Sequence, residues 1–385
     1  MPLLLAILFV SCTQFANQLY LPVLPTIASD FSLTNSFSQA LIICYLIALG
    51  IAQLIAGPCA DKYGDRKVIT YGLLLLITGT LICAFSTQYS YFLVGRVLQG
   101  FGCAAPVIIS RTILARSLNN TALKSAMANL AIAASITAII TPSLAGILAQ
   151  YLHWQGLTLV YAGYLVLILS LCLTQLKVQE TAESQSKQSL LSRYRAIFQN
   201  RQVLFIANIK WLPTYLYITL QLYLPFFMAE QFAMNTQQIG YGMTWPMVGL
   251  LLGTTLAKWM QKTTSYLTII LRFLPLLPLA AVLFLYAHFN AFIMIAACAM
   301  VMAVFGAYFP SYMHILGIVQ PTQTGSANAL VGAIELLFFS CLAWFTNLIL
   351  MTNAFLLCPL VISCAGLLWL SWGQLKKHPK LYQSA

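Results

Sequence analysis

The feature that most constrains this chain is a series of twelve long apolar stretches separated by short polar segments. The hydrocarbon core of a bilayer is about 30 Å thick, so a helix needs roughly 20 apolar residues to cross it. The stretches are residues 3–25, 36–59, 68–86, 91–114, 125–150, 157–176, 203–228, 239–261, 266–286, 291–317, 325–348 and 354–375. They predict an all-α membrane protein with twelve transmembrane helices, embedded in a lipid bilayer. The first stretch lacks the basic start and cleavage site of a signal peptide, so we expect it to be retained.

Composition excludes the other broad classes. Hydrophobic residues make up 61% of the chain and charged residues 7%, whereas soluble domains have about half and a quarter. A soluble enzyme or a disordered chain is therefore excluded. The net charge of +12 comes from 19 Lys and Arg against 7 Asp and Glu. Because these bases are sorted by loop rather than gathered in a patch, we expect no nucleic-acid partner.

The lysines and arginines indicate the orientation of the chain. They follow the second, fourth, sixth and eighth stretches and recur in the C-terminal tail. None occurs in the alternate loops near residues 26–35, 87–90, 151–156, 229–238, 287–290 and 349–353. Loops rich in Lys and Arg remain in the cytoplasm. We therefore predict a multi-pass protein of a bacterial inner (plasma) membrane with both termini cytoplasmic.

One long polar segment, residues 177–202, divides the chain into two sets of six stretches. Its first part is rich in Gln, Ser and Glu and is typical of a linker. From Ser189 onward, apolar residues recur at helical spacing among bases, which predicts an amphipathic helix on the membrane surface. The predicted domains are residues 1–176, the cytoplasmic linker 177–202, and residues 203–385 with a short tail.

The two halves share sequence in one register. Gln18–Pro22 (QLYLP) recurs identically as Gln221–Pro225, and Phe101–Pro106 (FGCAAP) is echoed by Phe305–Pro310 (FGAYFP). Repeated halves with proline-interrupted helices are typical of secondary transporters, whose substrates bind near the bilayer midplane at the repeat interface. We predict two pseudo-symmetric six-helix bundles that enclose a pathway for a small molecule within one chain, which therefore functions as a monomer.

The loop after the second stretch carries a family motif. Gly57–Lys67 (GPCADKYGDRK) resembles the G-x-x-x-D-[RK]-x-G-R-[RK] motif of the major facilitator superfamily. The resemblance implies that Gly57, Asp61, Gly64 and Arg66 form a latch that holds one alternating-access state. Asp65 stands where the family usually has a base, which implies a weaker latch. The alternative is a charged turn that only sets the topology.

Further motifs resemble one subgroup of this superfamily. Arg96–Gly100 (RVLQG) matches the R-x-x-Q-G motif of drug:proton antiporters, which implies a proton-coupling role for Arg96. Arg111–Arg116 (RTILAR) is similar to a segment of the Bcr/CflA-type subgroup. Two departures matter: Gln18 stands where that subgroup often has an Asp, and Thr141–Gly146 (TPSLAG) keeps only part of the antiporter motif of the fifth span. The coupling acid of the first span is therefore missing.

Glu335 is the one acid placed deep inside a stretch. It lies roughly 15 Å along a helix that begins near Gly325, on the same face as Asn328 and Gly332. A buried carboxyl group can bind and release protons as its surroundings change. We predict that Glu335 couples transport to protons. The alternatives are a structural carboxylate paired with an embedded base, and a direct contact to a cationic substrate.

Two bases are embedded less deeply. Lys210 and Arg272 lie roughly 9–11 Å inside their stretches. We expect Lys210 to face the cavity, whereas Arg272 either joins it or reaches back to the headgroups. Together with Arg96 these bases would make the cavity positive, which favours an anionic or zwitterionic substrate over a lipophilic cation.

Aromatic and polar residues complete the predicted cavity. An aromatic site with few polar groups suits a promiscuous pocket, although aromatic residues also form membrane-interface belts. His314 could relay protons or only hydrogen-bond a neighbour. The predicted substrate cavity comprises Gln18, Gln99, Arg111, Lys210, Tyr215, Gln221, Trp245, Tyr308 and Asn328.

These features lead to two functional hypotheses. The first is a secondary active transporter that exports small organic molecules in exchange for protons, of the multidrug efflux type. The second is an organic-anion transporter, such as a carboxylate-siderophore exporter or a metabolite carrier. The sequence has no phosphate-binding loop, CxxC pair or metal-ligand cluster, so we expect neither an enzyme, a cofactor nor a metal.

Overall fold

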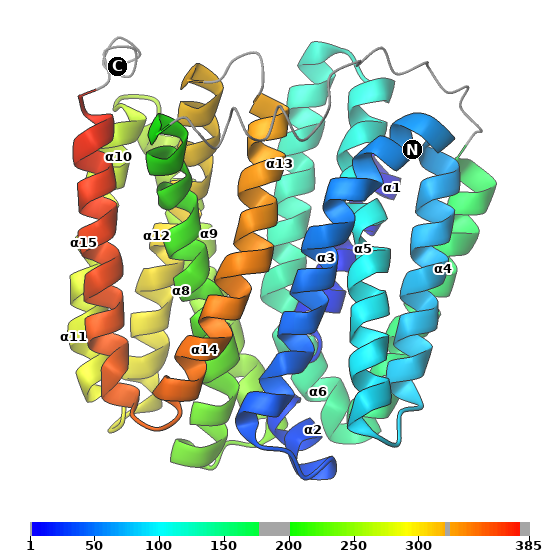
Figure 1. Ribbon diagram of the computed structural model, residues 1–385, viewed down its shortest axis with the longest axis horizontal. Coiled ribbons are helices and arrows are strands. Elements are labelled where there is room, and N and C mark those ends of the chain that lie inside the picture. The colour runs from blue at the N-terminus through cyan, green and yellow to red at the C-terminus, as the bar shows by residue number, and fades with distance from the viewer. Residues whose placement is uncertain (1, 177–200, 320–323, 378–385) are drawn as a thin grey trace. The chain divides into compact units, whose positions relative to one another are not determined.

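The computed structural model describes residues 2–176, 201–319 and 324–377, and all regular structure within them is helical (Figure 1). The predicted linker and amphipathic helix fall outside the described residues, except for Arg201 and Gln202, which begin a membrane helix. The chain divides into two compact units, Met1–Ser186 with Met234–Thr244, and Lys187–Ala233 with Trp245–Ala385.

The first unit contains six membrane passes. Its elements are α1 (Pro2–Gln18), α2 (Leu24–Asp30), α3 (Asn35–Tyr63), α4 (Asp65–Ala84), α5 (Tyr89–Ser117) and α6 (Asn120–Gln175). The first pass is broken between α1 and α2 next to Pro22, because proline lacks the N–H that a continuous helix needs. At His153 the backbone of α6 leaves helical geometry, with φ 56° and ψ 172°. That break divides α6 into two passes.

The second unit also contains six passes. Its elements are α8 (Arg201–Phe232), α9 (Thr236–Met260) from Trp245 onward, α10 (Tyr266–Phe273), α11 (Leu276–Tyr286), α12 (Ala291–Val319), α13 (Thr324–Ile334), η1 (Glu335–Phe339), α14 (Ser340–Leu350), η2 (Ala354–Leu356) and α15 (Leu357–Leu375). The helices α10 and α11 form one pass that is interrupted at Pro275. A second pass runs from α13 through the π-helical turn η1 into α14.

These passes confirm the predicted fold class. Nine helices in the described ranges are long and apolar enough to cross a membrane. The other passes are the broken α1–α2 segment, α9, and the second arm of α6. Within the second unit, α8 packs against α12, α14, α15 and η1. These neighbours bury most of the length of α8, including side chains near its middle.

Small residues set the distance between α9 and α12. A Cβ atom added to Gly253 would lie 2.0 Å from the carbonyl oxygen of Ala303, and one added to Gly249 would lie 2.1 Å from that of Ala299. Helices in membranes use such residues to bring their backbones into direct contact.

Substituting Gly253 by Ala is therefore expected to destabilise the protein by about 1–3 kcal/mol, because the new methyl group overlaps a backbone atom that cannot move alone. The matched control is Gly366→Ala in α15, where a Cβ atom meets nothing within 4 Å. That change is expected to be neutral or slightly stabilising, since Ala favours helix over Gly. Thermal unfolding of the purified variants measures the difference, and equal melting temperatures would contradict the described α9–α12 packing.

Candidate functional site

A buried ion pair lies inside the second unit. The Nζ atom of Lys210, on α8, is 2.6 Å from Oε2 of Glu335, the first residue of η1. Each residue is only 8% exposed. Removing two charges from water costs free energy that their attraction and hydrogen bonds must offset. The structure thus gives Glu335 an embedded base as its partner, which was one of the alternatives for this residue, and its role with protons stays a prediction.

The turn that carries Glu335 is π-helical over five residues, Glu335–Phe339. Its wider winding interrupts the regular ladder of the pass, and Ser340 donates a hydrogen bond to the carbonyl of Leu336. Such turns are rare and are frequently found at functional sites. Here the turn places an acidic side chain against α8 in the middle of an otherwise apolar pass.

Two aromatic rings lie beside the ammonium of Lys210, and one of them is hydrogen-bonded to an amide. Its Nζ lies 5.5 Å from the ring centre of Tyr312 and 5.7 Å from that of Phe309, both on α12. The hydroxyl of Tyr312 donates to Oδ1 of Asn328 at 3.1 Å. A Cβ atom added to Gly332 would lie 3.8 Å from Nζ, so α13 presents bare backbone beside the ammonium. The predicted face of Asn328, Gly332 and Glu335 therefore belongs to one network around Lys210.

An aromatic wall adjoins this network. The indole of Trp211 donates to the carbonyl of Val331 at 2.9 Å, and its ring centre lies 5.5 Å from that of Phe339. The hydroxyl of Tyr215 is 2.6 Å from that of Thr346. Trp211, Tyr215 and Phe339 are all buried, and charges interact more strongly in such low-dielectric surroundings.

The second embedded base, Arg96, lies in the first unit and is fully buried. It donates from Nε to the carbonyl of Leu41 at 3.0 Å, and from one terminal nitrogen to the carbonyl of Ala16 at 3.1 Å and to Oε1 of Gln99 at 2.7 Å. Ala16 lies near the end of α1, where helix carbonyls lose their intrahelical donors. Arg96 therefore ties the broken first pass to α3 and α5.

The groups that face the charge of Arg96 are aromatic rings, not a carboxylate. The centre of its guanidinium lies 4.7 Å from the ring centre of Tyr20 and 4.4 Å from that of Tyr45. Within the described ranges, no carboxylate lies within salt-bridge distance of this side chain, and its other terminal nitrogen has no hydrogen-bond partner. The amide of Gln99 donates to Thr80 at 2.9 Å and to Tyr20 at 3.3 Å. Cation–π contacts and hydrogen bonds to oxygen atoms therefore stabilise the buried guanidinium.

The predicted latch has a different base at its centre. Arg116 contacts both acids of the motif, Asp61 at 3.2 Å and Asp65 at 2.8 Å. Arg66 instead donates to the carbonyl of Leu173 at 2.8 Å. Gly64 has φ 85°, a left-handed backbone that favours glycine at the turn between α3 and α4.

The charged cluster at the motif therefore includes Asp65 and Arg116, neither of which belongs to the predicted latch. The side chain of Asp65 is 4% exposed, whereas that of Asp61 is 60% exposed. The resemblance of Arg111–Arg116 to a family segment was the available signal for Arg116. Gly57, the first residue of the motif, has open space where a Cβ atom would be.

Asp65 and Asp61 are expected to contribute differently to the stability of the protein. Asp65→Asn should destabilise the protein by about 1–3 kcal/mol, because it removes the charged partner of a hydrogen bond that is buried on the acid side. Asp61→Asn should cost at most about 1 kcal/mol, as for other exposed ion pairs. Thermal unfolding at low and at 0.5 M salt measures both. A larger loss for Asp61→Asn would refute this ranking.

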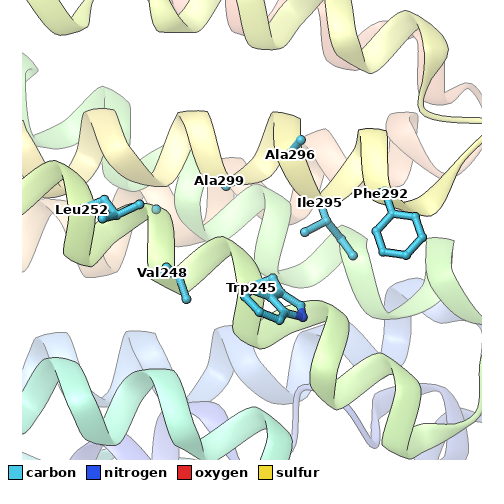
Figure 2. A pocket seen from close by; sticks show the side chains of 8 residues that line it. Trp245, Val248, Leu252, Phe292, Ile295, Ala296 and Ala299 are labelled. Atoms are coloured by element: carbon cyan, nitrogen blue, oxygen red, sulfur yellow. The ribbon is translucent and has the colours of Figure 1, made fainter.

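The other predicted cavity residues lie in several places. Gln18 and Tyr308 are fully buried, and the Tyr308 hydroxyl donates to the carbonyl of Ile270 at 2.7 Å. Gln221 is buried on α8, while Arg111 is exposed on α5. Trp245 is 61% exposed and lines an apolar groove of about 470 Å³ between α9 and α12, which Figure 2 shows.

The structure also shows where Arg272 and His314 lie, two residues for which the sequence left alternative roles open. Arg272 is exposed on α10. The ring of His314 stacks on that of Tyr266 with 3.8 Å between centres. Neither contacts the Lys210–Glu335 pair in the described structure.

Comparisons with known proteins agree with this architecture. The chain is 25% identical over 200 residues to Multidrug resistance protein D of Escherichia coli, covering 51% of this chain and 50% of that protein. It is 28% identical over 183 residues to Multidrug resistance protein MdtL of Citrobacter koseri, covering 46% and 47%. The matches thus span about half the length of these curated relatives.

Solved structures extend the likeness to the whole fold. A bacterial homolog of the human lysosomal transporter Spinster, in an inward-facing and unoccupied conformation, superimposes with a TM-score of 0.76 at 11% identity, covering 100% of this chain and 97% of that one. A D-xylose-proton symporter gives a TM-score of 0.74 at 15% identity, covering 95% and 96%.

A family model decides the assignment. The model described as Major Facilitator Superfamily matches residues 6–340, which is most of the chain and covers parts of both units. Members of this family are multi-pass membrane transporters of small molecules, usually with coupled ions, and are not enzymes. With its motifs, its all-helical twelve-pass fold and this match, the chain belongs to the Major Facilitator Superfamily.

Proposed function

We propose that this protein exports small organic molecules from a bacterial cell in exchange for protons, by alternating access, and that the Lys210–Glu335 pair couples the two movements. The observation that carries the proposal is a buried ion pair, 2.6 Å long, on a π-helical turn inside a membrane pass. Ionisable residues at such places mark ion or substrate pathways in membrane proteins. The names of the multidrug-resistance relatives support the same direction of transport.

The Lys210–Glu335 pair is a better candidate than Arg96 for coupling transport to protons. Glu335 is the buried acid within a pass, and its partner can lose a proton, whereas a guanidinium stays charged in proteins. Arg96 holds three elements of the first unit together through carbonyl oxygens and rings. We therefore assign Arg96 to the framework of that unit and the proton chemistry to the pair.

The surroundings of Lys210 and Arg96 weigh against the alternative of an organic-anion carrier. It was motivated by three embedded bases that would make a cavity positive. Lys210 is neutralised by Glu335, Arg272 is exposed, and Arg96 is enclosed within the first unit. The distribution of bases among the loops supports an inner-membrane location with both termini cytoplasmic, and the repeated halves support a monomeric carrier.

Transport into inverted membrane vesicles tests the proposal. The vesicle lumen is acidified by respiration, and an acridine dye reports its pH while drugs, siderophores and carboxylates are added in turn. An exporter that exchanges its substrate for protons should raise the lumen pH when a substrate is added, and vesicles without the protein should not respond. If no compound moves protons or accumulates in a manner that depends on the pH gradient, the proposal is wrong.

A further inference from the structure

The ammonium of Lys210 occupies a site whose groups suit an organic cation equally well. Oε2 of Glu335 lies 2.6 Å from Nζ, and the ring centres of Tyr312 and Phe309 lie 5.5 and 5.7 Å away. A carboxylate beside aromatic faces is the arrangement that binds amines and quaternary ammonium ions. Lys210 thus fills, with its own side chain, a cation site formed by α12 and η1.

We propose that Lys210 is a tethered competitor of the substrate: an organic cation displaces its ammonium from Glu335, and the displaced lysine releases the proton that is exchanged. This inference rests on the proposed function, to which it adds a substrate class and a source for the proton. The cation forms the new ion pair with Glu335, one N–H bond of Lys210 breaks, and the proton goes to water. Lys210 remains as a neutral amine.

Charge balance favours this step over a simple displacement. At rest the pair is neutral, and after the exchange the cation and Glu335 are neutral together while Lys210 carries no charge. A lysine that kept its proton would leave one uncompensated charge in a buried place, which is strongly unfavourable. Lysine loses its proton readily under such conditions, whereas arginine does not.

The groups around Lys210 offer it no second counter-charge. Of the elements packed against α8, η1 brings Glu335 and α12 brings Tyr312 to the ammonium. The contacts of α14 and α15 with α8 include the uncharged Thr346, Asn347 and Ser371. Across the described ranges, no other carboxylate lies within salt-bridge distance of Lys210.

Two features of the site bear on how the lysine and a cation could exchange places. The backbone at Gly332 lies beside the ammonium without a side chain in between. Phe309, whose ring faces the ammonium, is 41% exposed, so the aromatic side of the pair borders the surface of the second unit. A cation can therefore approach along the ring of Phe309 while the lysine withdraws past α13.

An anionic substrate predicts the opposite movement of protons. An anion could bind Lys210 only if Glu335 accepted a proton, so the anion and the proton would be bound together and could not be exchanged. The sign of the proton change on binding therefore distinguishes the two substrate classes.

The experiment measures binding and proton release on the purified full-length protein in weakly buffered detergent solution with a pH indicator. The probes are tetraphenylphosphonium, the smaller benzyltrimethylammonium, and tetraphenylborate, an anion of the same shape as the first. We expect at least one of the cations to bind wild-type protein and release about one proton for each cation bound, as the charge balance requires. We expect tetraphenylborate to release none.

Variants of the pair sharpen this result. In Lys210→Gln the lysine competitor is gone, so cations should bind about tenfold more tightly or better, and any proton released then comes from Glu335 instead of the lysine. Lys210→Arg should bind cations about tenfold more weakly and release no proton, since the guanidinium stays charged. Glu335→Gln should lose cation binding. Lys258→Gln, at an exposed position near the end of α9, is the matched control and should behave as wild type.

Three outcomes would overturn the inference: neither cation binds wild type or Lys210→Gln, a cation binds wild type without releasing a proton, or tetraphenylborate binds with proton uptake. If Glu335→Gln does not fold, the double variant Lys210→Gln/Glu335→Gln lacks both charges and should also fail to bind cations. Each of these failures leaves transport driven by the pH gradient intact in vesicles. Conversely, cation binding with proton release but no gradient-driven flux would overturn the proposed function alone.

Discussion

Replacing Glu335 by Gln is expected to abolish proton-coupled transport and to destabilise the protein by about 3–5 kcal/mol, because the buried Lys210 must then either keep a charge without a partner or give up its proton, and both cost free energy. The transport loss should be complete within the sensitivity of a vesicle assay. The stability loss should appear as a lower melting temperature in detergent. The matched control is Glu230→Gln, an exposed acid near the end of α8, which should change neither quantity.

The double variant Lys210→Met/Glu335→Leu separates stability from function. Replacing both members of a buried pair by apolar residues is often neutral or stabilising. We therefore expect this variant to regain most of the melting temperature lost in Glu335→Gln, yet to remain unable to couple transport to protons. If the double variant transported against a gradient like wild type, the pair would be only a structural element of the second unit.

Replacing Arg96 by Leu is expected to be among the most destabilising single changes in the first unit, with a loss of about 3–5 kcal/mol. Leucine fills part of the space but leaves the carbonyl of Ala16 and Oε1 of Gln99 buried without their donor. The two ring contacts with Tyr20 and Tyr45 are lost as well. Thermal unfolding and the yield of monodisperse protein in detergent measure the effect.

Arg96→Lys provides an informative intermediate. Lysine keeps the charge but cannot reach three acceptors that are spread around a planar guanidinium. Its melting temperature should fall between those of wild type and Arg96→Leu. The matched control is Arg272→Leu, at an exposed position on α10, for which we expect little change. If Arg96→Leu were as stable as that control, Arg96 would not tie the broken first pass to its neighbours.

The twelve passes could be predicted from the sequence because membrane thickness fixes the length of each apolar stretch. The depth of Glu335 followed from helical rise alone, and so did the shared face with Asn328 and Gly332. The π-helical turn at Glu335 could not be predicted. It adds one residue to a helical turn, and the apolar residues of this pass follow a regular helical pattern in the sequence. That turn is what directs the acid toward α8.

Contacts between residues that are distant in sequence could not be predicted either. Lys210 and Glu335 were both singled out, yet the sequence assigned Lys210 to a positive cavity rather than to this acid. Arg116 meets Asp61 and Asp65 from another helix, which no local spacing could show. Trp245 lines an apolar groove that the sequence did not reveal, and its place in the substrate cavity stays a prediction.

Accumulation against a gradient tests the central claim most directly. Proteoliposomes with an acidic lumen are given a radiolabelled substrate identified in the vesicle screen, at equal concentration on both sides. Wild-type protein should concentrate the substrate inside until the pH gradient is dissipated, whereas Lys210→Met/Glu335→Leu, reconstituted at equal density, should leave the two concentrations equal. Equal accumulation by both proteins would contradict the claim that this ion pair couples substrate movement to protons.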